Sequence, residues 1–244
     1  MKSIFSKLWI ILLSFSLLIS CAGKKKEEDT AESLYISAMK LLKDKNYLDA
    51  GKEFEKIDDD FPFSKWAIKG QVMATYAYFK ERDYDKVIQL SEDFARINST
   101  SNYIPYMLYL RGLSYYLQIP SIERSQDYSA LASSVFRELI IKYPKDEHAI
   151  DAKSKLEFID EHLAGAVLSK ARKQIKVKNF IGAINHLQFL VDRYRYTNQV
   201  AEGYYRLAEI YWFLGDKKEF IKAKNIVLKQ FPKSYWGEQL ANFK

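Results

Sequence analysis

Two short patterns recur along this chain at intervals typical of repeat proteins. In the first, a polar residue precedes an aromatic residue, and a small or branched apolar residue follows three positions after the aromatic. It occurs in Asn46-Tyr47-Leu48-Asp49-Ala50, Asp83-Tyr84-Asp85-Lys86-Val87 and Asn179-Phe180-Ile181-Gly182-Ala183. The second pattern is an aromatic–proline pair, which accounts for three of the five prolines: Phe61-Pro62, Tyr143-Pro144 and Phe231-Pro232. Recurrence at about 20–50 residues is the signature of stacked repeats, so it limits the fold more than any other feature.

Between these marks, apolar residues recur at the spacing of α-helices. In a frame of about 34 residues that starts at Ala31, large and small residues alternate as in tetratricopeptide repeats. The frame holds, in order, Leu34, Ala38, Leu41, Ala50, Phe54, Ile57 and Pro62. Small residues at Ala38 and Ala50 let the two helices of a hairpin approach, and Phe54 fills the seam between them. Only 9 glycines are present, against about 17 at average usage, which disfavours a turn-rich all-β fold.

The fold class expected is therefore all-α, a superhelical stack of about five tetratricopeptide-like helical hairpins. Hairpins are predicted near residues 31–62, 65–99, 102–144, 147–196 and 198–232, with a short capping helix near 234–243. The third hairpin carries an insertion at residues 118–125. The fourth begins with a stretch from Glu147 to Val177, which is too long for one ordinary repeat helix. We predict two helices there, meeting near Leu163–Gly165 and dividing an N-terminal from a C-terminal half.

The N-terminus has the features of an export signal. Two lysines precede an apolar run from Leu8 to Ile19, which is shorter than the roughly 20 residues that a bilayer crossing needs. The run ends in Leu18-Ile19-Ser20-Cys21, which resembles a bacterial lipobox. Residues 1–20 are thus predicted to be a lipoprotein signal peptide, cut between Ser20 and Cys21. The alternative is an ordinary signal peptide with a chance cysteine.

The lipobox implies that Cys21 carries an S-diacylglycerol and an N-acyl group, the only covalent group expected on this chain. Residues 21–30 have no apolar pattern and are predicted to form a lipidated flexible tether. Lys24–Lys26 could touch anionic headgroups, but a solvated linker is favoured. Residue 22 is alanine rather than aspartate, which by the bacterial sorting rule indicates the outer membrane.

Charge and motifs argue against nucleic-acid binding and catalysis. Residues 1–20 hold two lysines and no acidic residue, so the remaining chain keeps 36 basic against 31 acidic residues, a mild net charge of +5. The three histidines, His148, His162 and His186, do not have metal-ligand spacing. The sequence contains no GxSxG, P-loop or GxGxxG motif. No catalytic residue, cofactor or metal is predicted, and Asp58–Asp60 is interpreted as a solvated helix terminus.

Stacked hairpins form an extended concave surface that suits a peptide. The lining of that surface is expected from four positions of each first helix. These are positions 2, 5, 9 and 12 of the repeat. Counted from Ala31 they include Tyr35 and Met39, and counted from Ile68 they include Lys69 and Tyr76. With Phe63, in the loop between the two hairpins, these are the five candidate groove residues. The alternative for each residue is packing between hairpins.

Several segments resemble the BamD family of outer-membrane lipoproteins more closely than the generic repeat does. They are Phe61–Ser64, Tyr76–Lys80, Tyr106–Leu113, Ile122–Gln126 and a central segment made up of Phe136–Ile140, Tyr143-Pro144, Asp151-Ala152 and His162–Ala164. The resemblance spans nearly the whole chain. Ser125 and the pair Tyr194-Arg195 depart from the family pattern, which leaves the local contacts there open.

The resemblance implies a non-enzymatic scaffold of β-barrel assembly in a Gram-negative bacterium, held at the outer membrane and facing the periplasm. Residues 31–144 would receive unfolded outer-membrane protein precursors. The groove position of Lys69, and not the resemblance, leads to the hypothesis that Lys69 meets their terminal carboxylate. Residues 145–244 would dock on the periplasmic domains of BamA, beside other lipoproteins of that complex.

Two other classes of protein are compatible with a repeat lipoprotein. One is a scaffold of peptidoglycan or cell-division machinery, which would co-purify with cell-wall factors instead of BamA. The other is a cell-wall enzyme such as a lytic transglycosylase. Such an enzyme needs an added catalytic domain, for which the repeats over residues 31–244 leave no room.

Overall fold

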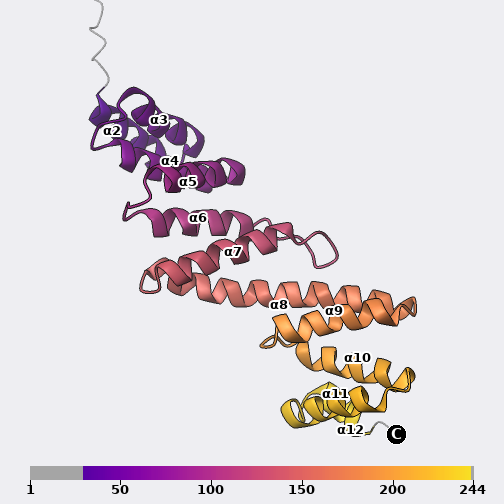
Figure 1. Cartoon of the computed structure of the whole chain (residues 1–244). Coiled ribbons are helices and arrows are strands. Elements are labelled where there is room, and N and C mark those ends of the chain that lie inside the picture. The colour runs from indigo at the N-terminus through magenta and orange to yellow at the C-terminus, as the bar shows by residue number, and fades with distance from the viewer. Residues whose placement is uncertain (1–29, 243–244) are drawn as a thin grey trace, which may run out of the picture.

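The computed structural model describes residues 30–242, which form a stack of helical hairpins (Figure 1). Its helices are α2 (Ala31–Lys43), α3 (Tyr47–Asp60), α4 (Ala67–Glu81), α5 (Tyr84–Ile97), α6 (Ile104–Tyr116), α7 (Asp127–Lys142), α8 (Glu147–Lys176), α9 (Phe180–Arg193), α10 (Val200–Phe213), α11 (Lys217–Gln230) and α12 (Tyr235–Ala241). Between residues 30 and 242 there is no strand. The predicted all-α fold, its five hairpins and its capping helix are confirmed.

The tight hairpin turns share one backbone geometry. In each turn, a residue with positive φ comes immediately before the N-cap residue of the second helix. These positive-φ residues are Lys45, Arg82, Lys178 and Gly215. The next residue then caps the helix in three of the four turns. Asp83 accepts a hydrogen bond from the backbone N–H of Lys86, Asn179 from Gly182 and Asp216 from Glu219. Such caps satisfy a free N–H group at a helix start, which explains the recurring polar–aromatic pattern.

Small residues sit in the seams of the hairpins, as the repeat pattern predicted. Ala38, Ala50 and Phe54 are completely buried. The third hairpin contains a very close approach, because a Cβ added at Gly112 would lie 2.4 Å from Cε1 of Phe136. Only glycine leaves room for the Phe136 ring at this point, so the third seam depends on that pair.

Three hydrophobic cores succeed one another along the stack. The first joins α2–α5 with Leu110 of α6, the second joins α4–α8, and the third joins α8 with α9–α12. The change from the second core to the third falls within α8. Ile159 packs in the second core and Ala164 in the third. Helix α8 is therefore the element that connects the two halves.

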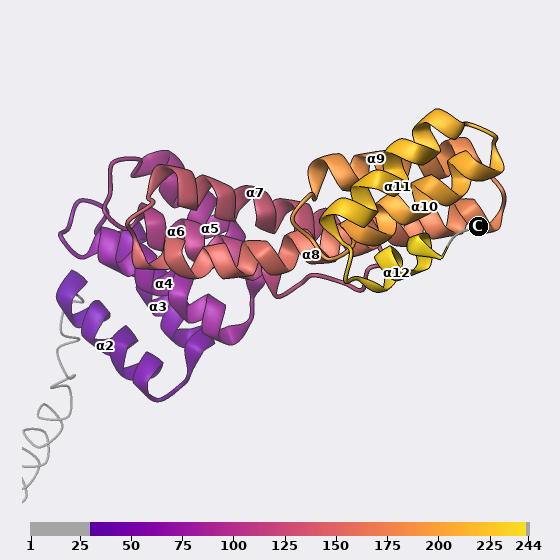
Figure 2. The same ribbon diagram turned by 90° about the horizontal axis from the view of Figure 1, so that it is seen from below.

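The prediction of two helices between residues 147 and 177 is wrong. Helix α8 is continuous over 30 residues, and Figure 2 shows it running past both halves of the stack. Gly165 does not break it, since a mid-helix glycine costs only about 1 kcal/mol relative to alanine. Buried residues on both sides of it, Ala164 and Leu168, hold the helix against the third core.

Gly165→Ala is expected to stabilise the protein by about 0.5–1 kcal/mol. A Cβ at this position would meet nothing nearer than Ile122 Cγ2 at 3.8 Å and Gln199 Nε2 at 3.9 Å, which is ordinary contact. Denaturant unfolding followed by helix circular dichroism measures the change. A loss of stability would mean that the backbone at Gly165 is not helical. Gly112→Ala is the matched control and should destabilise.

The insertion between α6 and α7 is ordered by its own side chains. Gln126 Nε2 donates to the carbonyl groups of Ser121 and Arg124, and Ser125 donates to Asp127 at 2.7 Å. Between residues 30 and 242, no helix combines the length and apolar character that a bilayer crossing demands. The predicted signal peptide, the Ser20–Cys21 cleavage site and residues 21–29 of the tether lie outside the described residues.

Candidate functional site

An aromatic stripe follows the first helices of the first four hairpins. It consists of Tyr35 on α2, Tyr76 on α4, Tyr106 and Tyr109 on α6, and His148 on α8. The His148 ring lies 5.1 Å from the Tyr106 ring and 4.8 Å from the Tyr109 ring, and it is nearly parallel to the latter. These first helices pack side by side, α2 on α4, α4 on α6 and α6 on α8. The stripe thus crosses the whole N-terminal half.

Burial raises the pKa of three tyrosines of the stripe, Tyr35, Tyr106 and Tyr109. It raises the pKa of Tyr106 to about 12, with a smaller contribution from the nearby Tyr76 hydroxyl. Burial and a hydrogen bond to Asp151 likewise raise the pKa of Tyr109. The phenol groups give this otherwise apolar stripe its polar handles.

A pocket of about 560 Å³ opens beside the stripe, between α2, the start of α3 and α4. Its apolar wall consists of Met39, Leu42, Tyr47 and Tyr76, and its cations are Lys40, Lys43 and Lys80. The Lys80 Nζ lies 5.8 Å from the centre of the Tyr47 ring. We call this the first-repeat pocket. An apolar wall with a few convergent charges is the usual composition of a ligand site.

Two of the five predicted groove residues line the first-repeat pocket, Met39 and Tyr76. Tyr35 lies one helical turn before Met39, and its ring packs 4.7 Å from the Trp66 ring. Lys69 does not line the pocket; its Nζ lies 5.4 Å from the centre of the Trp66 ring. Phe63, in the loop between α3 and α4, is fully exposed and also lies outside the pocket.

Sequence reasoning missed the cations and Tyr47. Lys40 and Lys43 are one turn apart on α2, and Lys80 follows Tyr76 by four residues on α4, so each pair shares a helix face. That spacing is visible in the sequence. The three lysines and Tyr47 stand outside the repeat positions that are expected to face the groove, so the repeat pattern alone does not select them.

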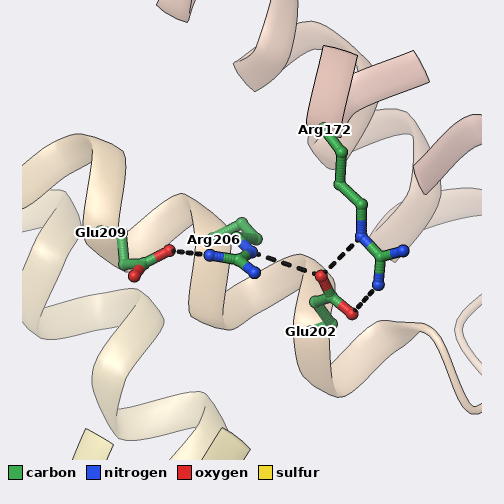
Figure 3. Close-up of polar contacts among 4 residues, drawn as sticks. All are labelled: Arg172, Glu202, Arg206 and Glu209. Atoms are coloured by element: carbon green, nitrogen blue, oxygen red, sulfur yellow. Dashed lines mark hydrogen bonds and ion pairs between the residues drawn. The ribbon is translucent and has the colours of Figure 1, made fainter. Parts of the chain in front are cut away.

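The C-terminal half contains an ion-pair network that joins α8 to α10 (Figure 3). The almost entirely buried Glu202 accepts two hydrogen bonds from the guanidinium group of Arg172 and one from Arg206 at 3.3 Å. Arg206 also pairs with Glu209 at 2.7 Å, and its guanidinium lies 5.1 Å from the centre of the Trp236 ring. The network therefore ties α12 and α10 to the long helix.

Glu202→Gln is expected to lower the free energy of unfolding by about 2 kcal/mol, because it removes charge-assisted hydrogen bonds from a buried carboxylate. The loss stays below the 3–5 kcal/mol typical of a fully buried pair, since Arg172 is about half exposed and regains water. Denaturant unfolding measures it. Glu238→Gln, an exposed change on α12, is the control. Equal values for both variants would contradict a structural role for the network.

A second cavity, of about 440 Å³, lies where the two halves meet. Three carboxylates of α8 face the end of α9 and the loop after it, and the lining is Glu157, Asp160, Glu161, Arg193, Tyr194, Tyr196 and Thr197. Asp160 accepts two hydrogen bonds from Arg137 of α7, at 2.8 and 2.9 Å. We call this the junction cleft. Its charged walls and the exposed Tyr196 distinguish it from the apolar first-repeat pocket.

Comparison with known proteins covers nearly the whole chain. A family model described as an outer membrane lipoprotein, YfiO, matches residues 27–236. An outer membrane protein assembly factor BamD of Rickettsia prowazekii is 31% identical over 235 residues, which cover 95% of this chain and 94% of that protein. The assembly factor BamD of Neisseria meningitidis serogroup A is 31% identical, covering 92% of each chain. That of Caulobacter vibrioides is 27% identical, covering 88% of this chain and 73% of its own length. This chain therefore belongs to the YfiO family of outer membrane lipoproteins, which is the family of the BamD assembly factors.

Proposed function

We propose that this chain is a non-enzymatic scaffold of β-barrel assembly, anchored by a lipid in the outer membrane and facing the periplasm. The relatives are named outer membrane protein assembly factors, which supports a role for this chain in the assembly of outer membrane proteins. The more specific part of the proposal concerns the first-repeat pocket. It receives the end of an unfolded barrel precursor, whose last strand carries aromatic and apolar residues.

The chemistry of the pocket fits such an end. An aromatic side chain lies against Met39, Leu42 and Tyr76, while the terminal carboxylate meets the ammonium groups around it. Charge-assisted hydrogen bonds of this kind are about twice as strong as neutral ones. The aromatic stripe then offers further phenol rings to the preceding residues of an extended peptide. In this proposal Lys40, Lys43 and Lys80 bind the carboxylate in place of Lys69, because they line the pocket and Lys69 does not.

A peptide that ends in phenylalanine tests the pocket. Tyr76→Ala is expected to weaken its binding about 30-fold, the effect of about 2 kcal/mol usual for a central aromatic contact. Amidation of the peptide's terminal carboxylate should weaken binding about 10-fold, because the lysines lose their partner. Fluorescence anisotropy of a labelled peptide gives both values.

Tyr128→Ala on α7 is the control, because Tyr128 is partly exposed like Tyr76 and lies outside the pocket. Binding that is equal in both tyrosine variants, or indifferent to amidation, would rule the pocket out as the precursor site. The family assignment would stand in that case, because it depends on sequence similarity over most of the chain.

The C-terminal half is proposed to dock on the periplasmic domains of BamA, beside other lipoproteins of the complex. The junction cleft supports this proposal, because it combines carboxylates, Arg193 and the exposed Tyr196 at one place. Tyrosine and arginine are enriched at the energetically important points of interfaces. The lipid on Cys21 would hold the N-terminal half close to the membrane.

A further inference from the structure

Two hairpin turns meet at the edge of the C-terminal half and expose a cluster of apolar side chains. The turn between α8 and α9 lies next to the turn between α10 and α11 (Figures 1 and 2), and the Phe180 and Phe213 rings are 4.9 Å apart. The exposed members are Val177 (70% exposed), Ile181 (76%), Trp212 (49%), Phe213 (69%) and Leu214 (51%). We call these five residues the tip patch. Large apolar side chains gathered on exposed turns mark an interaction surface.

The surroundings of the tip patch are strongly basic. Residues 162–191 contain no aspartate or glutamate but five basic residues, Lys170, Arg172, Lys173, Lys176 and Lys178. This stretch alone therefore carries a net charge of +5. The start of α11 places Lys217 and Lys218 on the neighbouring turn, between Asp216 and Glu219, so that turn has no net charge and the positive charge comes from the α8 side.

These lysines are available to a partner. Arg172 is engaged by Glu202. Among the described residues, no carboxylate forms an ion pair with any of the exposed lysines Lys173, Lys176, Lys178, Lys217 and Lys218. They would therefore be complemented by a partner that carries negative charge.

We propose that the tip patch is a second membrane contact, in which the lysines bind anionic phospholipid headgroups and the apolar side chains enter the interface. Basic residues around Trp, Phe and Leu side chains are the composition of interfacial membrane-binding surfaces. Each lysine near an anionic leaflet contributes enough to strengthen binding about five-fold. The patch lies on two projecting turns, a shape that suits a deformable lipid surface.

The contact would set the orientation of the molecule. The two turns of the tip patch project from the side of the C-terminal half, far from α2, where the described chain begins (Figure 1). A protein held at residue 21 by acyl chains and at the tip by headgroups would lie along the membrane. The tip contact itself does not depend on the acyl anchor, so the two can be tested separately.

The test uses the chain from residue 21 onward with Cys21→Ser, so that no acyl group holds it to a vesicle. All residues of the three cores lie between Ala31 and Leu240, so this chain keeps its folded part intact. Vesicles contain about a third phosphatidylglycerol in phosphatidylethanolamine, with bromine on the acyl chains to quench inserted tryptophan. Subtracting the signal of Trp212→Phe isolates Trp212 from Trp66 and Trp236.

We expect quenching of Trp212 that saturates with lipid and is absent on purely zwitterionic vesicles. Lys176→Gln with Lys218→Gln should weaken binding about 25-fold. The control is Lys229→Gln with Lys233→Gln, the same charge change at and just beyond the other end of α11, about 20 Å away, and binding should not change. Unchanged thermal unfolding of both variants shows that they are folded.

No quenching of Trp212, or equal weakening by both lysine pairs, would overturn the proposal. Binding of poly-glutamate that depends on Lys176 and Lys218, without quenching by phosphatidylglycerol vesicles, would overturn it too. That result would assign the patch to an acidic protein.

Discussion

Phe136→Ala is expected to lower the free energy of unfolding by about 3–5 kcal/mol, the largest stability effect of any single substitution discussed. The ring is completely buried in the second core, 6.4 Å from the rings of both Tyr109 and Tyr116. Gly112 leaves the space that the ring fills, so truncation opens a cavity in the seam of the third hairpin. The neighbouring helices α6 and α8 are tied to α7 by their connections and cannot close the cavity fully.

Denaturant unfolding followed by helix circular dichroism measures the loss, with Phe158→Ala as the matched control. Phe158, on α8, is about half exposed, so the same chemical change should cost much less there. Because repeat arrays can unfold in parts, the transition midpoint and its slope are compared together. Equal costs for the two variants would contradict the packing described for the third hairpin.

Cys21→Ser is expected to move the protein from the membrane fraction to the soluble fraction. Each buried CH₂ contributes about 0.8 kcal/mol, and a single acyl chain holds a protein only marginally. Bacterial lipoproteins typically carry three chains, so their loss removes the whole anchor. Fractionation of cell envelopes measures the effect, and a high-salt wash releases any binding through the tip patch.

The control for the anchor is Ser20→Ala, which keeps a small residue before the cysteine and should leave the protein membrane-bound. Intact mass of the purified protein should show an N-acyl and an S-diacylglycerol group on the wild-type chain and neither on Cys21→Ser. Wild-type protein whose intact mass lacks both groups would contradict lipid attachment at this residue.

Local signals in the sequence were sufficient to predict most of the fold. The polar–aromatic turns and the aromatic–proline pairs mark where hairpins turn and end, because caps and prolines act within a few residues. Gly215-Asp216 forms the same turn as Arg82-Asp83 but lacks the aromatic residue after it, so the pattern did not reveal it. The prediction of two helices in place of α8 is wrong because the continuity of α8 depends on packing against two cores. No local pattern in the sequence encodes that packing.

The site was predicted less completely than the fold. Counting helix positions found Met39 and Tyr76, since residues on one helix face are fixed by the period. The helix period could not predict the contact between Lys80 and the Tyr47 ring, because that contact depends on how α3 and α4 pack together. The Arg172–Glu202 pair joins residues 30 positions apart on different helices, so only the structure could reveal it.

Purification of the tagged full chain from envelopes in mild detergent tests the proposed scaffold most directly. The predicted result is a complex that contains BamA, recognised as a large barrel protein with periplasmic repeats, together with other lipoproteins of the same machinery. Changes in the junction cleft, such as Tyr196→Ala with Arg193→Ala, should reduce the recovered BamA while the chain stays in the membrane. Consistent absence of BamA, with peptidoglycan or cell-division proteins recovered in its place, would contradict the account.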